Sequence, residues 1–328
     1  MQDETEFEDA NENWAWRPTS MALLETAESR ILARLHNASS SRFVTLPDNN
    51  QIRTLTITAH QGEQASKIPL VMVHGFGGGM GLWIRNLDPL SCSRTVHAFD
   101  LLGFGRSSRP DFPMDAKQAE DQWVTSIEQW RQAMGVELMI LLGHSLGGYL
   151  VTSYAIRYPD RVAHLILVDP WGFPKPWFRP ITSLFSHFNL LGIIRGAGPL
   201  GPALVSFRRG LKRAFKDLFD DDTVTNYVYH CNAQQPSGEV GFRAMNQTVA
   251  WAQRPMIQRV HLLRPSMPLN MLLGGRSWLP NSYRDTVDQI RGQSHTQLMV
   301  IPNGSHHFYA DQYDLFNREV QRICDTVD

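Results

Sequence analysis

A serine between two glycines is the residue best suited to chemistry in this sequence. It lies in Gly143-His144-Ser145-Leu146-Gly147, after a short apolar run and before a helical stretch. The GxSxG pattern makes a sharp strand-to-helix turn that exposes the serine hydroxyl. Glycines flank it because side chains there would clash with the neighbouring backbone. We predict that Ser145 is a catalytic nucleophile, and a purely structural turn is the alternative.

A second glycine-rich segment, His74 to Gly79, follows another apolar run. Acyl transfer requires two backbone N–H donors aimed at the developing oxyanion. The N–H groups of Phe76 and Leu146 are predicted to supply them, forming an oxyanion hole. A phosphate-binding loop is the rival interpretation, but the segment does not fit GxGxxG and no GK[ST] follows.

A general base and an orienting acid must complete such a site, in the chain order serine, acid, histidine. His306, in the pair that follows the last predicted strand, is the predicted base, because its ordinary pKa suits proton transfer. The acid is left open. Asp169 ends the strand after the nucleophile helix, whereas Asp285 and Asp288 follow the strand after which the acid is expected. The absence of any orienting carboxylate is the third possibility.

A mostly parallel, doubly wound α/β sheet is the scaffold that these positions require. Apolar runs that end at turns alternate with helical stretches, as in α/β folds. These runs are 69–73, 95–99, 138–142, 164–168, 269–273 and 297–301.

The alternation is interrupted after the strand ending at Asp169, where 170–265 is rich in aromatic residues, proline and glycine. We expect a helical cap there, inserted at the carboxyl edge of the sheet. The domain organisation predicted is an acidic arm and N-terminal helix (1–41), a hydrolase core (42–169 and 266–328) and the cap (170–265).

Composition excludes several other classes of protein. The 328 residues carry 31 basic and 32 acidic side chains, so no wholly basic surface for nucleic acid is expected. The three widely spaced cysteines form neither a disulfide framework nor a metal site, and we expect no metal and no cofactor. The first 12 residues contain six acids and no base, unlike a secretory signal, and no apolar run reaches about 18 residues. A cytoplasmic location is expected.

Six longer motifs together resemble the family of α/β-hydrolase domain-containing proteins 4 and 5. They are PLVMVHGFGGGMGLW (69–83), FDLLGFGRSSRP (99–110), LLGHSLGGYL (141–150), LILVDPWGFP (165–174), YHCNAQ (229–234) and SHHFYADQ (305–312). The resemblance implies an α/β-hydrolase fold and a role in lipid metabolism. One branch acts on N-acylphosphatidylethanolamine and its lyso form, and the other is a coactivator of triacylglycerol lipase with asparagine at the nucleophile position.

Ser145 and the doubled His306-His307 favour the hydrolytic branch. We therefore expect a serine phospholipase or lysophospholipase that removes acyl chains from N-acylphosphatidylethanolamine or related lysophospholipids. One alternative is a non-catalytic lipid-droplet coactivator, with a lipase or a droplet coat protein as partner. The other is a lysophosphatidic acid acyltransferase, since the family's HxxxxD motif is matched by His306 and Asp311. We expect Asp311 to cap the last helix instead.

The sequence departs from the family where relatives carry the triad aspartate. The segment after Trp278 is short, and Pro280 stands at the position where that aspartate is expected. This departure makes Asp169 a candidate for the acid.

Lipid-facing features are predicted in the cap and at the N-terminus. Aromatic residues are expected to line an acyl tunnel or to form the core of the cap itself: Trp171, Phe173, Trp177, Phe178, Phe185 and Phe188. A basic amphipathic stretch favours a membrane or lipid-droplet surface, although it also fits a solvated helix face: Arg208, Arg209, Lys212, Arg213 and Lys216. Trp14 and Trp16 either enter a lipid interface or pack on the fold.

Overall fold

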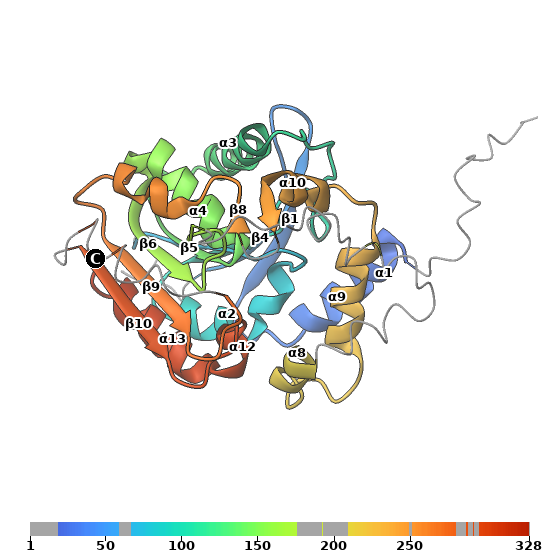
Figure 1. The fold of residues 1–328 in the computed structure, drawn as a ribbon. Helices are drawn as coiled ribbons and strands as arrows, with labels where there is room; N and C mark the ends of the chain where they lie inside the picture. The colour runs from blue at the N-terminus through green and yellow to red at the C-terminus, as the bar shows by residue number, and fades with distance from the viewer. Residues whose placement is uncertain are drawn as a thin grey trace, which may run out of the picture.

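The computed structural model describes residues 19–58, 67–175, 192, 209–248, 251–279, 287, 291 and 295–327. Its main feature is an eight-stranded sheet in the order β1-β2-β4-β3-β5-β6-β9-β10 (Figure 1). The strands are β1 (Ser39–Thr45), β2 (Gln51–Ile57), β3 (Leu70–Val73), β4 (Val96–Phe99), β5 (Met139–His144), β6 (Val162–Val168), β9 (Leu269–Gly274) and β10 (Thr296–Ile301).

The sheet is parallel from β4 to β10, and antiparallel where β1 pairs with β2 and β2 with β4. Every residue of β3, β4, β5 and β9 is buried, which explains why these strands are nearly continuous apolar runs. All the parallel strands end at the same edge of the sheet. The predicted mostly parallel α/β architecture is confirmed.

Helices cover both faces of the sheet (Figure 1). One face carries α3 (Ala116–Met134) and α4 (Leu146–Arg157), and the other carries α2 (Ile84–Ser91) and α13 (Tyr313–Cys324). Alternate residues of each strand enter different hydrophobic clusters: Val71 joins the cluster of α3 and α4, and Met72 joins that of α2 and α13. This period of two is what a sheet buried on both faces requires.

The predicted helices at the two ends of the chain are both present, and their first and last residues differ slightly from the prediction. Helix α1 (Met21–Leu32) begins after Ser20, whose hydroxyl accepts from the Leu23 N–H, and it packs against α9 (Thr223–Ala233). The single terminal helix expected from Asp311 is instead α12 (Phe308–Asp311) followed by α13. Two short 3-10 helices, η3 (Met80–Trp83) and η4 (Pro159–Arg161), complete the core.

The chain between β6 and β9 contains α8 (Arg209–Ala214), α9, α10 (Gly238–Met245), η6 (Met256–Gln258) and η7 (Val260–Leu262). It also contains a short antiparallel pair that the sequence did not predict, β7 (Asn246–Thr248) with β8 (Trp251–Ala252). Strands of three and two residues are too short to leave a periodic pattern in the sequence. Division into core and cap at 170 and 265 stays a prediction.

Several predicted lipid-facing residues lie outside the described residues: Trp14, Trp16, Trp177, Phe178, Phe185, Phe188 and Arg208. Trp171 and Phe173 are described, and both are buried in the core cluster. For these two residues the structure supports core packing.

Candidate active site

Ser145 lies at the sharp turn between β5 and α4. Its backbone has φ 52° and ψ −117°, a strained conformation for a residue with a side chain. The flanking glycines allow the close approach that the turn requires, since a Cβ on Gly147 would lie 2.5 Å from the carbonyl oxygen of His74. The strain and the tight packing are those of the predicted nucleophile turn.

The glycine-rich segment after β3 runs directly against this turn. A Cβ on Gly75 would lie 2.9 Å from the Cβ of Ser145, and the Gly78 N–H donates to the Gly75 carbonyl at 3.1 Å, closing a turn that contains Phe76. Leu146 is the first residue of α4, so its N–H has no acceptor within the helix. Both predicted oxyanion donors therefore belong to segments that adjoin the Ser145 side chain.

Two buried side chains hold the glycine-rich segment in place. His74 Nε2 accepts from the Leu101 N–H at 3.0 Å, and Asp100 Oδ1 accepts from the Met80 N–H at 2.7 Å. Burial lowers the pKa of His74 to about 4, so its ring is neutral at pH 7 and can accept this hydrogen bond. Sequence inspection did not identify either contact.

His306 contacts both of its predicted partners. Its Nε2 lies 3.0 Å from Ser145 Oγ, and its Nδ1 lies 2.5 Å from Asp169 Oδ2. The three side chains are 7%, 8% and 3% exposed for Ser145, His306 and Asp169, so the hydrogen-bonded chain is shielded from water. Asp285 and Asp288, the other candidates for the acid, lie outside the described residues.

The Asp169 carboxylate has two further donors. The Gly274 N–H donates to Oδ1 at 3.1 Å, and the Ser277 hydroxyl donates to Oδ2. Asp169 itself has φ 44°, a conformation that only Asn, Asp and Gly adopt readily. Sequence inspection missed Ser277, although a hydroxyl where an acid was expected after β9 was a usable signal.

The His144 side chain contacts the backbone of His306. Its Nε2 lies 2.9 Å from the His306 carbonyl oxygen, so this nitrogen carries a proton and donates. Burial, followed by the neighbouring His306 and His307, lowers the pKa of His144 well below its usual value, which keeps the ring neutral. Its ring also packs edge-on against Trp83 and Tyr309.

Asp311 does not cap the last helix, so that expectation was wrong. Its carboxylate accepts from the Ser305 N–H at 3.2 Å, and α13 is preceded by Gln312. Asp311 is the last residue of α12, where its side chain can turn back toward the loop before His306. Because both ring nitrogens of His306 contact Ser145 and Asp169, the structure does not form a His306–Asp311 pair within the described residues.

Aromatic side chains surround the candidate site. Phe76 stacks on Phe242 of α10 with ring centroids 4.3 Å apart, and Phe242 contacts Trp171 at 4.7 Å. Trp278 meets His306 edge-on at 5.3 Å and is 55% exposed. His306 therefore lies beside the exposed indole ring of Trp278.

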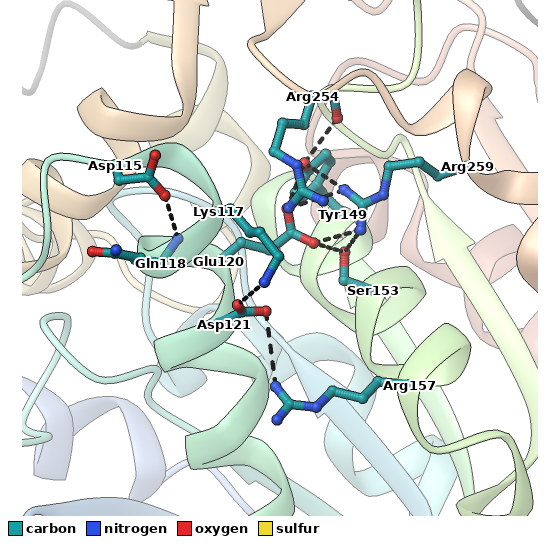
Figure 2. A network of polar contacts seen from close by, with 10 residues as sticks. All are labelled: Asp115, Lys117, Gln118, Glu120, Asp121, Tyr149, Ser153, Arg157, Arg254 and Arg259. Carbon is teal, nitrogen blue, oxygen red and sulfur yellow. Dashed lines mark hydrogen bonds and ion pairs between the residues drawn. The ribbon is translucent and has the colours of Figure 1, made fainter.

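A buried ionic network attaches the nucleophile helix to the segment before β9 (Figure 2). Glu120 of α3 is 3% exposed and pairs with Arg254 at 2.8 Å and with Arg259 at 2.5 Å. The same carboxylate lies 2.9 Å from the Tyr149 hydroxyl and 2.6 Å from the Ser153 hydroxyl, both on α4. Removal of either partner from such a buried ion pair is costly, so the network makes α4 a rigid support for Ser145.

The described residues contain neither a metal-binding cluster nor a helix that could span a membrane. Within the described ranges, no group of three or more His, Cys, Asp or Glu side chains could hold a metal ion. None of the helices in this part of the chain combines the length and apolar composition needed to cross a bilayer.

Comparison with known proteins connects this geometry with a family. Residues 68–313 match the sequence model of the alpha/beta hydrolase fold. The chain is 53% identical to the (lyso)-N-acylphosphatidylethanolamine lipase of Homo sapiens over 323 residues, which cover 94% of each chain. It is 44% identical to the 1-acylglycerol-3-phosphate O-acyltransferase ABHD5 of Homo sapiens, over 94% of this chain and 92% of that one.

Solved structures agree with the fold. The naproxen esterase of Bacillus subtilis superposes with a TM-score of 0.67 at 16% identity, over 92% of this chain and 97% of that one. A membrane phospholipase A described as a bacterial virulence factor gives 0.64 at 22% identity, over 94% and 91%. At these identities the likeness concerns the fold alone.

These matches confirm the family that the six motifs indicated. The chain belongs to the α/β hydrolase fold family, and within that family to the group that includes the (lyso)-N-acylphosphatidylethanolamine lipases.

Proposed function

We propose that this protein is a serine hydrolase that removes acyl chains from N-acylphosphatidylethanolamine and related lysophospholipids. The observation that carries the proposal is the hydrogen-bonded chain from Ser145 Oγ through His306 to Asp169. A serine in a strained turn, within 3.0 Å of a histidine that is itself oriented by a buried carboxylate, is an activated nucleophile.

In the proposed reaction, Ser145 Oγ attacks the acyl carbon while its proton passes to His306 Nε2. Asp169 accepts the Nδ1–H throughout, and so stabilises the imidazolium that forms. The oxyanion lies between the N–H groups of Phe76 and Leu146. His306 then protonates the departing glycerol oxygen. Water, deprotonated by the same histidine, hydrolyses the acyl-enzyme and restores the serine.

The phospholipid substrate is proposed from relatedness over the whole chain. The human protein that is 53% identical is named as a lipase of (lyso)-N-acylphosphatidylethanolamine, and the match spans 94% of both chains. Ser145 retains the hydroxyl that such a reaction requires. Hydrolysis is favoured over acyl transfer because Asp311 contacts the Ser305 backbone and leaves His306 to the serine and Asp169.

Activity-based labelling tests the nucleophile. A fluorophosphonate probe is expected to label the wild type and the control Ser126→Ala, and to leave Ser145→Ala unlabelled. Ser126 is a suitable control because its buried hydroxyl donates to the Trp123 carbonyl of the same helix. Equal labelling of Ser145→Ala would contradict the proposal.

Substrate class is tested with mixed micelles of N-acylphosphatidylethanolamine and detergent. We expect fatty acid release by the wild type and the loss of this release in Ser145→Ala. If purified protein instead transfers acyl groups from acyl-CoA to lysophosphatidic acid without releasing fatty acid, the acyltransferase alternative is correct.

We further propose that the protein works in the cytoplasm, bound peripherally to membranes or lipid droplets. Helices α1, α8 and α9 lie on one side of the molecule (Figure 1). Met21 and Leu23 of α1 are 42% and 45% exposed, and Lys212 and Arg213 of α8 are exposed as well. Exposed apolar and basic side chains on these helices suit an anionic lipid surface.

The positive charge of α8 is partly neutralised by an acidic residue, which limits the expected affinity for anionic lipid. Lys212 pairs with Asp222 at 2.6 Å. We expect co-sedimentation with vesicles containing phosphatidylserine, reduced severalfold by Lys212→Glu with Arg213→Glu, and weak binding to pure phosphatidylcholine. Unchanged binding of the double variant would show that these side chains do not contact lipid.

A further inference from the structure

Ser277 is a polar residue next to the triad that the proposed reaction does not use. It lies in the loop after β9, and its hydroxyl donates to Asp169 Oδ2, the same oxygen that contacts His306 Nδ1. We propose that Ser277 is a positioning residue that orients the triad carboxylate and lowers its basicity toward His306. This inference rests on the proposed hydrolase function.

The contacts of Asp169 show why a third donor matters. One oxygen accepts from the Gly274 N–H, and the other is shared between Ser277 and His306. A carboxylate that is 3% exposed has lost most of its water, so its charge depends on these donors. The Ser277 hydroxyl is a second donor at Oδ2, beside His306, and it restricts rotation of the carboxylate so that Oδ2 stays directed at the histidine.

The Ser277 hydroxyl is itself held in one orientation. The Leu279 N–H donates to Ser277 Oγ at 3.2 Å, which leaves the hydroxyl hydrogen for Asp169. The Ser277 N–H donates to the Gly274 carbonyl at 3.2 Å and closes the turn. This geometry differs from that of a surface serine, whose hydroxyl would rotate freely.

The loop that carries Ser277 is tied to the loop that carries His306. The Gly275 N–H donates to the Ile301 carbonyl at 3.0 Å, and the Arg276 N–H donates to the Gly304 carbonyl at 2.8 Å. Ser277 therefore keeps a constant position relative to the base. A single hydroxyl can then act on the pair His306–Asp169 without contacting the substrate.

The electrostatic consequence is measurable. A hydroxyl that donates to Oδ2 stabilises the carboxylate and weakens its attraction for a protonated His306. Its removal therefore strengthens that attraction. Among the described residues, the histidine rings that face His306 are those of His144 and His307, with centroids 4.7 and 5.1 Å away, and the substitution changes neither residue.

Ser277→Ala tests the proposal by hydrolysis of p-nitrophenyl octanoate from pH 5 to 9. We expect kcat to fall about tenfold with KM within about twofold of wild type, because the carboxylate loses the donor that keeps Oδ2 directed at His306. The acidic limb of the kcat/KM profile should move about half a pH unit upward. Ser277→Thr, which keeps the hydroxyl, should recover most of the rate, and Ser126→Ala serves as the matched control.

Three results would overturn the assignment: wild-type kcat in Ser277→Ala, a lower kcat with an unmoved acidic limb, or a threonine variant as impaired as the alanine variant. Thermal midpoints of both variants show whether a loss of rate reflects unfolding. Failure of the inference can be distinguished from failure of the proposed function with Asp169→Asn. Full activity in Ser277→Ala with an inactive Asp169→Asn overturns only the role of Ser277, whereas full activity in Asp169→Asn overturns the triad.

Discussion

The identity of the triad acid makes the most direct test of the proposed site. Asp169→Asn changes one oxygen to an NH2 group and retains the size of the side chain. Asparagine also tolerates the left-handed backbone of this position, where φ is 44°, so we expect the fold to persist. The variant therefore separates the charge of the residue from its packing.

The hydrogen bonds of Asp169 determine which way the amide must face. The Gly274 N–H requires an acceptor at Oδ1, so the amide oxygen takes that position and the NH2 group faces His306. His306 Nδ1 then becomes an acceptor, and the ring proton moves to Nε2. Because a protonated Nε2 cannot remove the proton of Ser145, general-base catalysis fails.

The expected loss is about 10³- to 10⁴-fold in kcat, or about 4 to 5.5 kcal/mol of transition-state stabilisation. Hydrolysis of p-nitrophenyl octanoate and the rate of fluorophosphonate labelling both measure it. A residual rate above that of buffer should remain, since the oxyanion donors at Phe76 and Leu146 are untouched.

The matched controls are Asp285→Asn and Asp288→Asn, the other carboxylates considered for this role. Both are expected to stay within about threefold of wild type if Asp169 is the carboxylate that orients His306. A fall of less than tenfold in Asp169→Asn, together with a large fall in either control, would refute the assignment of the acid.

Three further predictions concern stability and the position of the acid. Glu120→Gln should lower the free energy of unfolding by about 3–5 kcal/mol, because two arginines lose their buried partner (Figure 2). Asp121→Asn, on the same helix, is the control, and it should lower the free energy of unfolding by less than about 1 kcal/mol because Asp121 is more exposed. Burial, with a smaller contribution from the charge of Arg42, lowers the pKa of His97 to about 4. Stability is therefore lost as pH falls from about 6.5 toward 4, by about 2 kcal/mol at pH 5, and His97→Gln should remove this loss in urea titrations. Adding Ser277→Asp to Asp169→Asn should restore at least about tenfold of the lost kcat, because the Ser277 hydroxyl contacts the oxygen that faces His306.

Each of these predictions has a clear contrary outcome. Equal urea midpoints for Glu120→Gln and Asp121→Asn would mean that the ionic network does not stabilise the fold. An acid sensitivity that is the same in wild type and His97→Gln would show that another group binds the proton. A double variant as slow as Asp169→Asn would place position 277 too far from His306 for a carboxylate to act.

Local patterns in the sequence predicted the scaffold and two of the three residues of the proposed triad. Mostly apolar runs of five residues identified the parallel strands, because strands buried on both faces consist mainly of apolar side chains. The turn at Ser145 was recognisable because glycines must flank it, and His306 because it follows the last strand. Each of these signals extends over only a few neighbouring residues.

The proposed acid could be chosen among the candidates only with the tertiary structure. Asp169 and His306 are 137 residues apart, and Asp285 or Asp288 satisfied the same chain order. Because β6 pairs with β9, the end of β6 lies beside the loop that follows β9. The order of the strands in the sheet cannot be predicted from the apolar runs in the sequence. Only in the folded sheet does Asp169 meet His306.

The tertiary structure also decided how the remaining polar side chains are used. Ser277 and His144 contact groups that lie far away in the sequence, the Asp169 carboxylate and the His306 carbonyl oxygen. Secondary-structure patterns report which face of an element is apolar, and a hydroxyl or imidazole within a loop leaves no such period. The sequence alone therefore determined the class of chemistry and the elements that carry it. The contacts that orient the acid and base depend on strand order and loop packing, which arise only when distant segments meet.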